Sequence, residues 1–271
     1  MNLSQLNKLL KRKSETHKGE SGHVLAITGS DQYAGAALLC SVAALRVGAD
    51  LVTLTSPKEV GIAANSYCPD IMTIKLPGTC LKSSHYSKII KAAVKCNVIL
   101  IGNGIGQNAE TKKLVLKILK NKIIKNKLKV IDADALKMIK LQDVKNSILT
   151  PHKKEYETLL KNSKIKNEKE LKKKISNNII LLKGKNDKII TSKKTFINKT
   201  GNPGMAKAGT GDVLAGLCAG ILAKTSNLEQ SAKAAAWLNG YIGDILKKKK
   251  QGYYFIASDI INEIVKINCL D

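Results

Sequence analysis

Short apolar runs alternate with helical patterns along most of the chain. The first unit is the run HVLAIT at residues 23–28, which passes through the glycine-bearing turn GSDQYAG into a helical pattern over residues 36–47. The same alternation predicts further strands at 51–54, 71–74, 97–101, 128–131 and 147–150, with helices at 58–66, 85–95 and 110–120 and others after DADAL and after Pro151. Repeated strand, turn and helix units are typical of a parallel sheet covered by helices.

The pattern changes after about residue 178. Three β-branched runs at 178–183, 188–192 and 195–198 follow one another with only short turns between them, which predicts antiparallel hairpin strands at one end of the sheet. Helical patterns return at 213–224, 228–249 and 258–267, and residues 2–12 form a short amphipathic pattern. We therefore expect an α/β fold with one mainly parallel sheet, helices on both faces, and a single domain over residues 1–271.

Residues 201–216, GNPGMAKAGTGDVLAG, combine five glycines with one acid, Asp212, and run directly into an apolar helix. Glycines let backbone amides approach a ligand closely. The first turn of a helix leaves amides unpaired and attracts anions. Asp212 is therefore either a helix cap or a base beside a bound phosphate. In a parallel sheet such loops gather beyond the carboxyl ends of the strands.

The formal charge of +25 raises the alternative of a nucleic-acid-binding protein. Arg12 and Arg46 are the only arginines, and aromatic residues make up 4% of the chain. Nucleic-acid sites favour arginine forks and aromatic stacking, so we interpret the charge as a lysine-rich solvated surface.

The six cysteines contain no CxxC pair, which argues against zinc and disulfides, and Cys40 and Cys218 are expected in the core. No apolar run reaches the roughly 20 residues of a membrane helix, and the N-terminus lacks a signal sequence. The sequence thus predicts a cytoplasmic protein without a membrane span.

Six blocks occur in one order: HVLAITGSDQYAGAALL, IGNGIG, VIDADAL, LTPHKKE, LLKGKNDKI and TGNPGMAKAGTGDVLAG. From about Gly19 to the last helix the chain resembles the NAD(P)H-hydrate dehydratases, a branch of the ribokinase-like superfamily. The resemblance implies a ribokinase-like fold. It also implies a dehydratase domain without the epimerase domain to which some family members are fused.

The resemblance makes Asp212 the catalytic base. It implies substrate contacts at Ala36, Gly106, His152 and Asp212. It implies nucleotide and phosphate contacts at Lys183, Gly184, Lys185, Asn186, Asp187, Gly209, Thr210 and Gly211. No residue is assigned as a metal ligand.

The chain departs from the family pattern at three places. Asp187 stands where the family has Thr, Lys153 and Lys154 replace Pro and Gly, and Asn103 stands where Pro is common. Plainer roles stay open for several positions. His152 can be a capping residue, Ala36 and Gly106 can simply form tight turns, and KGKND can be a surface hairpin. For Asp132 and Asp134 we expect helix capping rather than a contribution to a Mg²⁺ site.

The implied reaction repairs NADH and NADPH whose nicotinamide ring has taken up water. ADP, or ATP, phosphorylates the 6-hydroxyl of the S epimer, and loss of phosphate restores the ring double bond. Mg²⁺ would offset the charge of the transferred group, and relatives suggest a homotetramer. A ribokinase-like kinase of a vitamin precursor or sugar remains the enzyme alternative, because it shares the fold and the Asp-based chemistry.

Overall fold

The computed structural model describes residues 1–12, 22–250 and 252–267. The glycine-containing segment expected at 14–22 therefore lies almost entirely outside the described residues, as do Gly19 and Cys269. Cys40 and Cys218 are fully buried in the core, as predicted. Within the described part of the chain, no helix combines the length and apolar character needed to cross a membrane.

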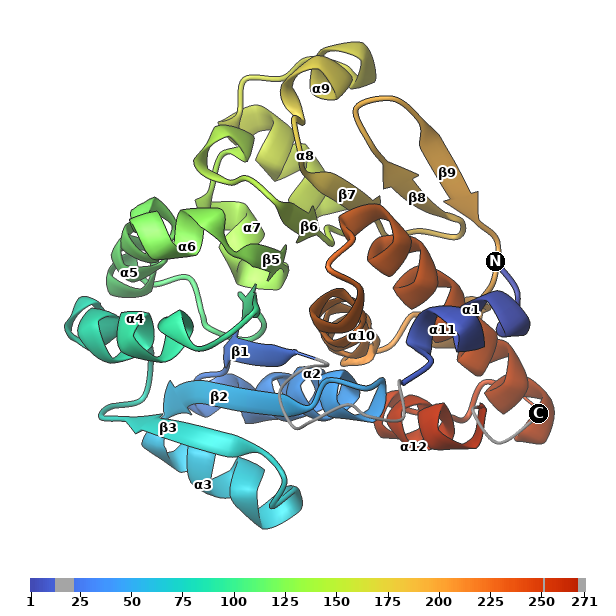
Figure 1. The fold of residues 1–271 in the computed structure, drawn as a ribbon, viewed down its shortest axis with the longest axis horizontal. Coiled ribbons are helices and arrows are strands. Elements are labelled where there is room, and N and C mark those ends of the chain that lie inside the picture. The colour runs from blue at the N-terminus through green and yellow to red at the C-terminus, as the bar shows by residue number, and fades with distance from the viewer. Residues whose placement is uncertain (13–21, 251, 268–271) are drawn as a thin grey trace.

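A nine-stranded sheet forms the centre of the molecule (Figure 1). Its strands lie in the order β3-β2-β1-β4-β5-β6-β7-β8-β9. All neighbours from β3 to β7 are parallel, and the pairs β7–β8 and β8–β9 are antiparallel. The bounds are β1 His23–Ile27, β2 Leu51–Pro57, β3 Met72–Leu76, β4 Val98–Ile101, β5 Leu128–Ile131, β6 Ser147–Leu149, β7 Ile179–Leu182, β8 Asp187–Ile190 and β9 Thr195–Asn198.

Helices cover both faces of this sheet because successive strand residues point to opposite sides. Val24 and Ala26 of β1 pack in one apolar core, whereas Leu25 and Ile27 pack in the other. The first core contains residues of α1 Leu3–Leu10, α2 Ala34–Arg46, α3 Lys58–Tyr67, α10 Thr210–Thr225, α11 Leu228–Lys249 and α12 Ala257–Ile267. The second contains residues of α4 Tyr86–Val94, α5 Ala109–Lys120, α6 Lys122–Asn126, α7 Ala133–Met138, α8 Lys153–Asn162 and α9 Glu168–Lys174.

The predicted architecture is confirmed, including the antiparallel strands at one end. The short helices α6 and α9 escaped the sequence analysis. Both are lysine-rich and carry one fully or almost fully buried apolar side chain each, Ile124 and Leu171. A single apolar residue produces no helical periodicity in the sequence, so neither helix was predicted. The N-cap side chain of each helix is an asparagine, Asn121 or Asn167.

Helix α10 begins three residues earlier than the sequence predicted. Its N-cap is Gly209, whose φ of 88° lies in the left-handed region that favours glycine. Asp212 is therefore the third residue of the helix and not its N-cap, so the capping alternative for this residue is wrong. The carboxylate lies in the first turn, among the amides at the positive end of the helix dipole.

Two glycines let α10 pack closely on α2. A Cβ atom on Gly216 would collide with the carbonyl oxygen of Cys40, and one on Gly220 would lie 2.5 Å from the carbonyl oxygen of Ala44. Both collisions involve helix backbone, which cannot rotate away as a side chain can. The distance between the two helices therefore depends on these glycines.

We expect Gly216→Ala to lower the free energy of unfolding by about 1–3 kcal/mol, because the added methyl overpacks the contact between α10 and α2. Gly35→Ala is the matched control, since a Cβ there meets no atom within 4 Å. The control should leave the stability unchanged or slightly higher. Urea denaturation of both variants measures the difference, and equal stabilities would contradict the packing argument.

Candidate active site

Loops that follow five neighbouring strands meet at the carboxyl edge of the sheet and are tied together by their backbones. The amide of Gly29, after β1, donates to the carbonyl oxygen of Asn103, after β4, at 2.8 Å. The amide of Asp132, after β5, donates to Ile101 at 3.1 Å, and the amide of Lys183, after β7, donates to Pro151 at 2.9 Å. The side chains of these loops therefore have fixed relative positions.

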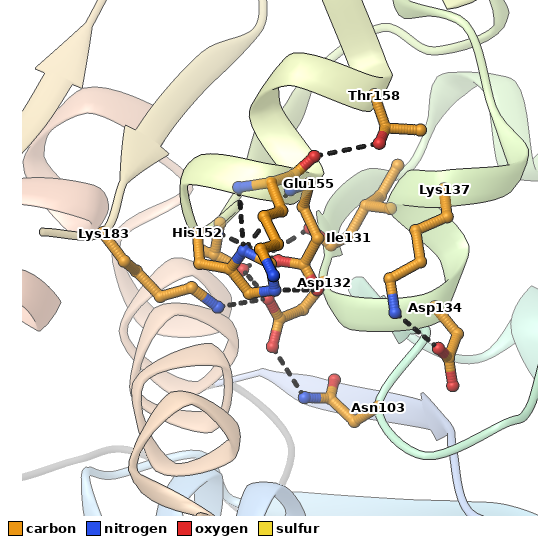
Figure 2. A network of polar contacts seen from close by, with 11 residues as sticks. Asn103, Ile131, Asp132, Asp134, Lys137, His152, Glu155, Thr158 and Lys183 are labelled. Carbon is orange, nitrogen blue, oxygen red and sulfur yellow. Dashed lines mark hydrogen bonds and ion pairs between the residues drawn. The ribbon is translucent and has the colours of Figure 1, made fainter. Parts of the chain in front are cut away.

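Asp132 lies at the centre of a polar network in this edge (Figure 2). One of its carboxylate oxygens accepts from the Lys183 ammonium at 2.9 Å and from the Thr150 hydroxyl at 2.7 Å. The other accepts from the Asn103 side-chain amide at 2.8 Å. Asp132 is 1% exposed, so a charge here requires these partners.

The capping role expected for Asp132 and Asp134 is wrong. Asp132 occupies the N-cap position of α7, but its side chain makes no capping hydrogen bond because it turns toward Lys183 and Asn103. Asp134 accepts from the amide of Gly106 at 3.0 Å and from Lys137 at 3.1 Å. It therefore ties the glycine loop after β4 to α7.

Lys183 lies beside the start of α10. A Cβ atom on Gly211 would be 3.4 Å from its ammonium nitrogen. Burial alone would lower the pKa of Lys183, but the carboxylates of Asp132 and Glu155 outweigh it and hold that pKa above its usual value. Lys183 is thus a permanent positive charge next to the first turn of α10.

The first turn of α10 presents unpaired amides. Within the described part of the chain, the backbone N–H groups of Gly211 and Asp212 find no acceptor, whereas that of Val213 already donates to Gly209 at 3.0 Å. The Thr210 hydroxyl points the other way, donating to Met205 at 2.7 Å. Two unpaired amides and the partly buried Lys183 form a place for an anion.

Asp212 shares this turn. Burial raises its pKa to about 6, the hydrogen bond from Asn103 at 2.7 Å opposes that rise, and the nearby Asp132 charge adds to it. A carboxylate with a pKa close to neutrality can accept a proton from a substrate and release it again. The site thus places a carboxylate with a raised pKa beside a helix terminus with two unpaired amides.

The GNPGM turn before α10 is held by α11. Asp244 accepts from the backbone amide of Gly201 at 2.9 Å and from the Asn202 side chain at 3.0 Å. A Cβ on Gly240 would overlap Thr200, and one on Gly243 would overlap the side chain of Met205. Asp244 and two glycines of α11 therefore fix the turn that leads into the site.

Ala36, in the first turn of α2, lies against the glycine loop after β4 that contains Gly106. A Cβ on Gly104 would be 2.9 Å from the Cβ of Ala36, so this loop lies directly against the start of α2. Gly106 has a φ of 76° and its amide is bound to Asp134. The two residues border the same edge of the sheet as Asp212.

His152 caps α8. Its Nδ1 accepts from the amides of Lys154 and Glu155 at 3.1 and 3.3 Å, and Glu155 accepts in return from the His152 amide at 2.9 Å. The ring is about half exposed. This capping box is the plainer alternative left open for His152, and its contact with substrate stays a prediction.

The KGKND segment forms the turn between β7 and β8. Asp187 accepts from the amide of Gly184 at 3.1 Å and from Asn198 at 3.2 Å, which closes the turn. Lys185 and Asn186 are exposed at its tip. In this segment, Lys183 binds the Asp132 carboxylate, whereas Asp187 stabilises the turn. Nucleotide binding by the whole segment stays a prediction.

Sequence reasoning missed Asn103, Thr150 and Asp244 as parts of the site. Asn103 follows the strand predicted at 97–101 and Thr150 is the last residue of the strand predicted at 147–150, so both positions indicated the carboxyl edge of the sheet. Asp244 lies in the middle of α11 and carries no local signal. Its contact with the turn at 201–202 depends on how two distant segments pack.

Asp212→Asn should stabilise the folded protein at about pH 8. The folded-state pKa of Asp212 is raised to about 6, above the ordinary unfolded value. Its ionised form therefore destabilises the fold once the pH exceeds both values. An amide removes this cost, of about 2–3 kcal/mol, and still accepts from Asn103.

Thermal unfolding at about pH 8 and about pH 4 tests this expectation. The gain of the Asp212→Asn variant should be present at the higher pH and disappear at the lower one, where the wild-type carboxyl is protonated. A variant no more stable than wild type at about pH 8 would contradict the charge assignment.

Comparison with known proteins yields concordant matches. A bifunctional NAD(P)H-hydrate repair enzyme of Methanocaldococcus jannaschii is 40% identical over 266 residues, covering 97% of this chain and 51% of that protein. An ADP-dependent (S)-NAD(P)H-hydrate dehydratase of Nitrosopumilus maritimus is 35% identical over 263 residues, covering 93% of this chain and 90% of that protein. The chain thus spans about half the length of the first relative.

The fold has solved counterparts. A ribokinase-like superfamily protein of Enterococcus faecalis superposes with a TM-score of 0.85 at 26% identity, covering 99% of this chain and 94% of that one. The ribokinase-like fold class is therefore confirmed. The sequence model of the NAD(P)H-hydrate dehydratase family matches residues 24–266. The chain belongs to the NAD(P)H-hydrate dehydratase family.

Proposed function

We propose that the protein dehydrates the S epimer of hydrated NADH or NADPH with ADP or ATP as the phosphoryl donor. One observation carries the proposal: the partly buried carboxylate of Asp212, with a pKa of about 6, lies in the same helical turn as two unpaired amides and next to Lys183. Phosphoryl transfer to a hydroxyl needs a base and a fixed positive environment for the transferred group, and this turn offers both.

In the first step the 6-hydroxyl of the hydrated ring attacks the terminal phosphorus of the nucleotide. Asp212 takes the hydroxyl proton as the new O–P bond forms, and the remaining nucleotide leaves with the electron pair of the broken P–O bond. The amides of Gly211 and Asp212 and the ammonium of Lys183 stabilise the charge on the transferred oxygens. These groups are already positioned, so little reorganisation accompanies the transfer.

In the second step phosphate leaves from carbon 6. The ring nitrogen supplies the electron pair that expels it, and transfer of a proton from the neighbouring carbon to the departing phosphate restores the ring double bond. Electron push from the ring makes a second protein acid unnecessary. The anion site at the start of α10 can hold the phosphate as it departs.

Magnesium fits this site only through the nucleotide. Both oxygens of Asp132 and one oxygen of Asp212 already accept hydrogen bonds from Lys183, Thr150 or Asn103. No group of three acidic, histidine or cysteine side chains in the described residues could enclose an ion. A Mg²⁺ ion would be held by phosphate oxygens and water, so we derive no step through protein-bound metal.

The remaining expectations belong to this proposal and stay predictions. They are a single dehydratase domain over residues 1–271, a homotetramer, a cytoplasmic location, and substrate contacts at Ala36, Gly106 and His152. They also include nucleotide contacts at Lys183, Gly184, Lys185, Asn186, Asp187, Gly209, Thr210 and Gly211. The charge of +25 fits the proposal, because a basic field draws in substrates that carry phosphates.

Asp212→Asn should lower kcat by about 10²–10⁴-fold, the usual contribution of a positioned base. Nucleotide binding should persist, because the amides of the first turn and Lys183 remain. Recovery of the reduced-nicotinamide absorbance measures turnover, and calorimetry with ADP measures binding. A variant that turns over like wild type would refute the assignment of the base.

Incubation of the wild-type protein with hydrated NADH and with either ADP or ATP separates the donors and the rival functions. We expect recovery of NADH, faster with ADP, the donor named for the Nitrosopumilus relative. A phosphorylated small alcohol without NADH recovery would favour the vitamin-precursor or sugar kinase. Tight binding to nucleic acid that weakens steeply with salt would instead revive that alternative.

A further inference from the structure

Asn103 connects the two central carboxylates of the site through one nitrogen atom. Its Nδ2 donates to Asp132 at 2.8 Å and to Asp212 at 2.7 Å. Asn103 itself is fully buried, and its backbone carbonyl is tied to Gly29. An amide NH₂ group has two hydrogens, and both are used on these two acids.

The two carboxylates differ in how they are neutralised. Asp132 also accepts from Lys183 and from Thr150, so three donors stabilise its charge. Among the described residues, Asn103 is the one side-chain donor found for Asp212. Like charges close together favour protonation of one of them, so the second hydrogen of Asn103 is what allows Asp212 to stay ionised beside Asp132.

The side-chain carbonyl oxygen of Asn103 destabilises the fold. This atom, Oδ1, is buried and has no hydrogen-bond partner among the described residues. Reversing the amide would not help, because it would turn a carbonyl oxygen toward two carboxylates. A buried acceptor without a donor is uncommon and destabilising. The Asn103 side chain therefore lowers the stability of the fold at its oxygen while its nitrogen binds both carboxylates of the site.

We propose that Asn103 is a positioning residue that holds the Asp212 carboxylate in one orientation and keeps it ionised next to Asp132. This departs from the family pattern, in which proline, a residue without a side-chain donor, is common at the position. The part of the proposal that concerns turnover rests on the proposed function. The part that concerns the titration of Asp212 does not.

Asn103→Leu removes one donor from Asp132 as well, but Lys183 and Thr150 still bind that carboxylate, so the other groups that act on Asp212 keep their charges. They are the charges of Asp132 and Asp134 beside α7 and of Lys183 after β7, and the Cys40 thiol of α2 also senses Asp212. Glu155 of α8 acts on Lys183. A change in the titration of Asp212 can therefore be attributed to the lost hydrogen bond.

The test compares wild type with Asn103→Leu, which keeps a similar size but has no donor. Carbon-13 NMR of aspartate carboxyls, with Asp212→Asn to assign the signal, follows Asp212 in the full-length protein without substrate. The midpoint of wild type should lie at about 6. In Asn103→Leu it should rise by about one pH unit, since a lost hydrogen bond to the charged form favours protonation.

Asn239→Leu is the matched control. Asn239 is also buried and also has an unpartnered Oδ1, but it makes no hydrogen bond to Asp132 or Asp212. The control should leave the midpoint of Asp212 unchanged. An unchanged midpoint in Asn103→Leu would overturn the proposal, and so would an equal shift in both variants.

Asn103→Asp keeps the test decisive if the leucine variant does not fold. It has the same shape but adds a third carboxyl, so at least one of the three should titrate above the wild-type midpoint of Asp212. Titration of all three at or below that midpoint would overturn the proposal. Circular dichroism of each variant identifies those that are folded.

The pH dependence of turnover completes the test. Asn103→Leu should lower the rate about fivefold more near pH 6 than near pH 8, because the fraction of ionised base falls only at the lower pH, whereas the lost orientation lowers the rate equally at both. If wild type turns over hydrated NADH and Asn103→Leu shows the same pH dependence of turnover as wild type, the positioning role is refuted. If neither wild type nor any variant turns over hydrated NADH but the Asp212 midpoint shifts in Asn103→Leu, the proposed function is refuted and the positioning role is supported.

Discussion

The close contact between α10 and α2 is the constraint on which the site depends. Gly216 and Gly220 bring the backbone of α10 against the carbonyl oxygens of Cys40 and Ala44, and no larger residue fits there. This contact sets where α10 begins, and therefore where the unpaired amides of Gly211 and Asp212 point. Gly209 in a left-handed conformation starts the helix abruptly at the carboxyl edge of the sheet. The position of these unpaired amides thus depends on helix packing.

The site also depends on how the charges of Asp132 and Asp212 are compensated by neighbouring groups. Burial at the sheet edge makes each ionised carboxylate costly, and the structure compensates Asp132 fully but Asp212 only partly. Lys183 and Thr150 both bind Asp132, whereas Asp212 receives one hydrogen bond and keeps a pKa of about 6. Two acids within reach of one amide nitrogen thereby acquire different tasks. Asp132 anchors the lysine, and Asp212 stays able to exchange a proton near neutral pH.

Local sequence signals predicted the fold well and the site in part. Strand and helix periodicity and glycine turns gave nearly all elements, because buried strands such as β4 and β5 are continuous apolar runs. The placement of Asp212, Ala36 and Gly106 at one edge followed from the parallel topology. The role of Asp132 was predicted wrongly, because the sequence shows that Asp132 stands at the N-cap position but not whether its side chain makes the capping hydrogen bond. In the folded protein the Asp132 carboxylate binds Lys183, Thr150 and Asn103 and does not cap the helix.

The sequence by itself determined the α/β alternation, the glycine-rich start of α10 and the family of the chain, because each is written in contiguous residues. The tertiary structure alone decided which polar groups meet. Asn103 and Asp212 are separated by 109 positions, and Asp244 reaches the turn at Gly201 across 43. Contacts of this kind arise from the strand order and the helix crossing. No local pattern encodes them, since hydrogen bonds and pKa values depend on distances in space and not along the chain.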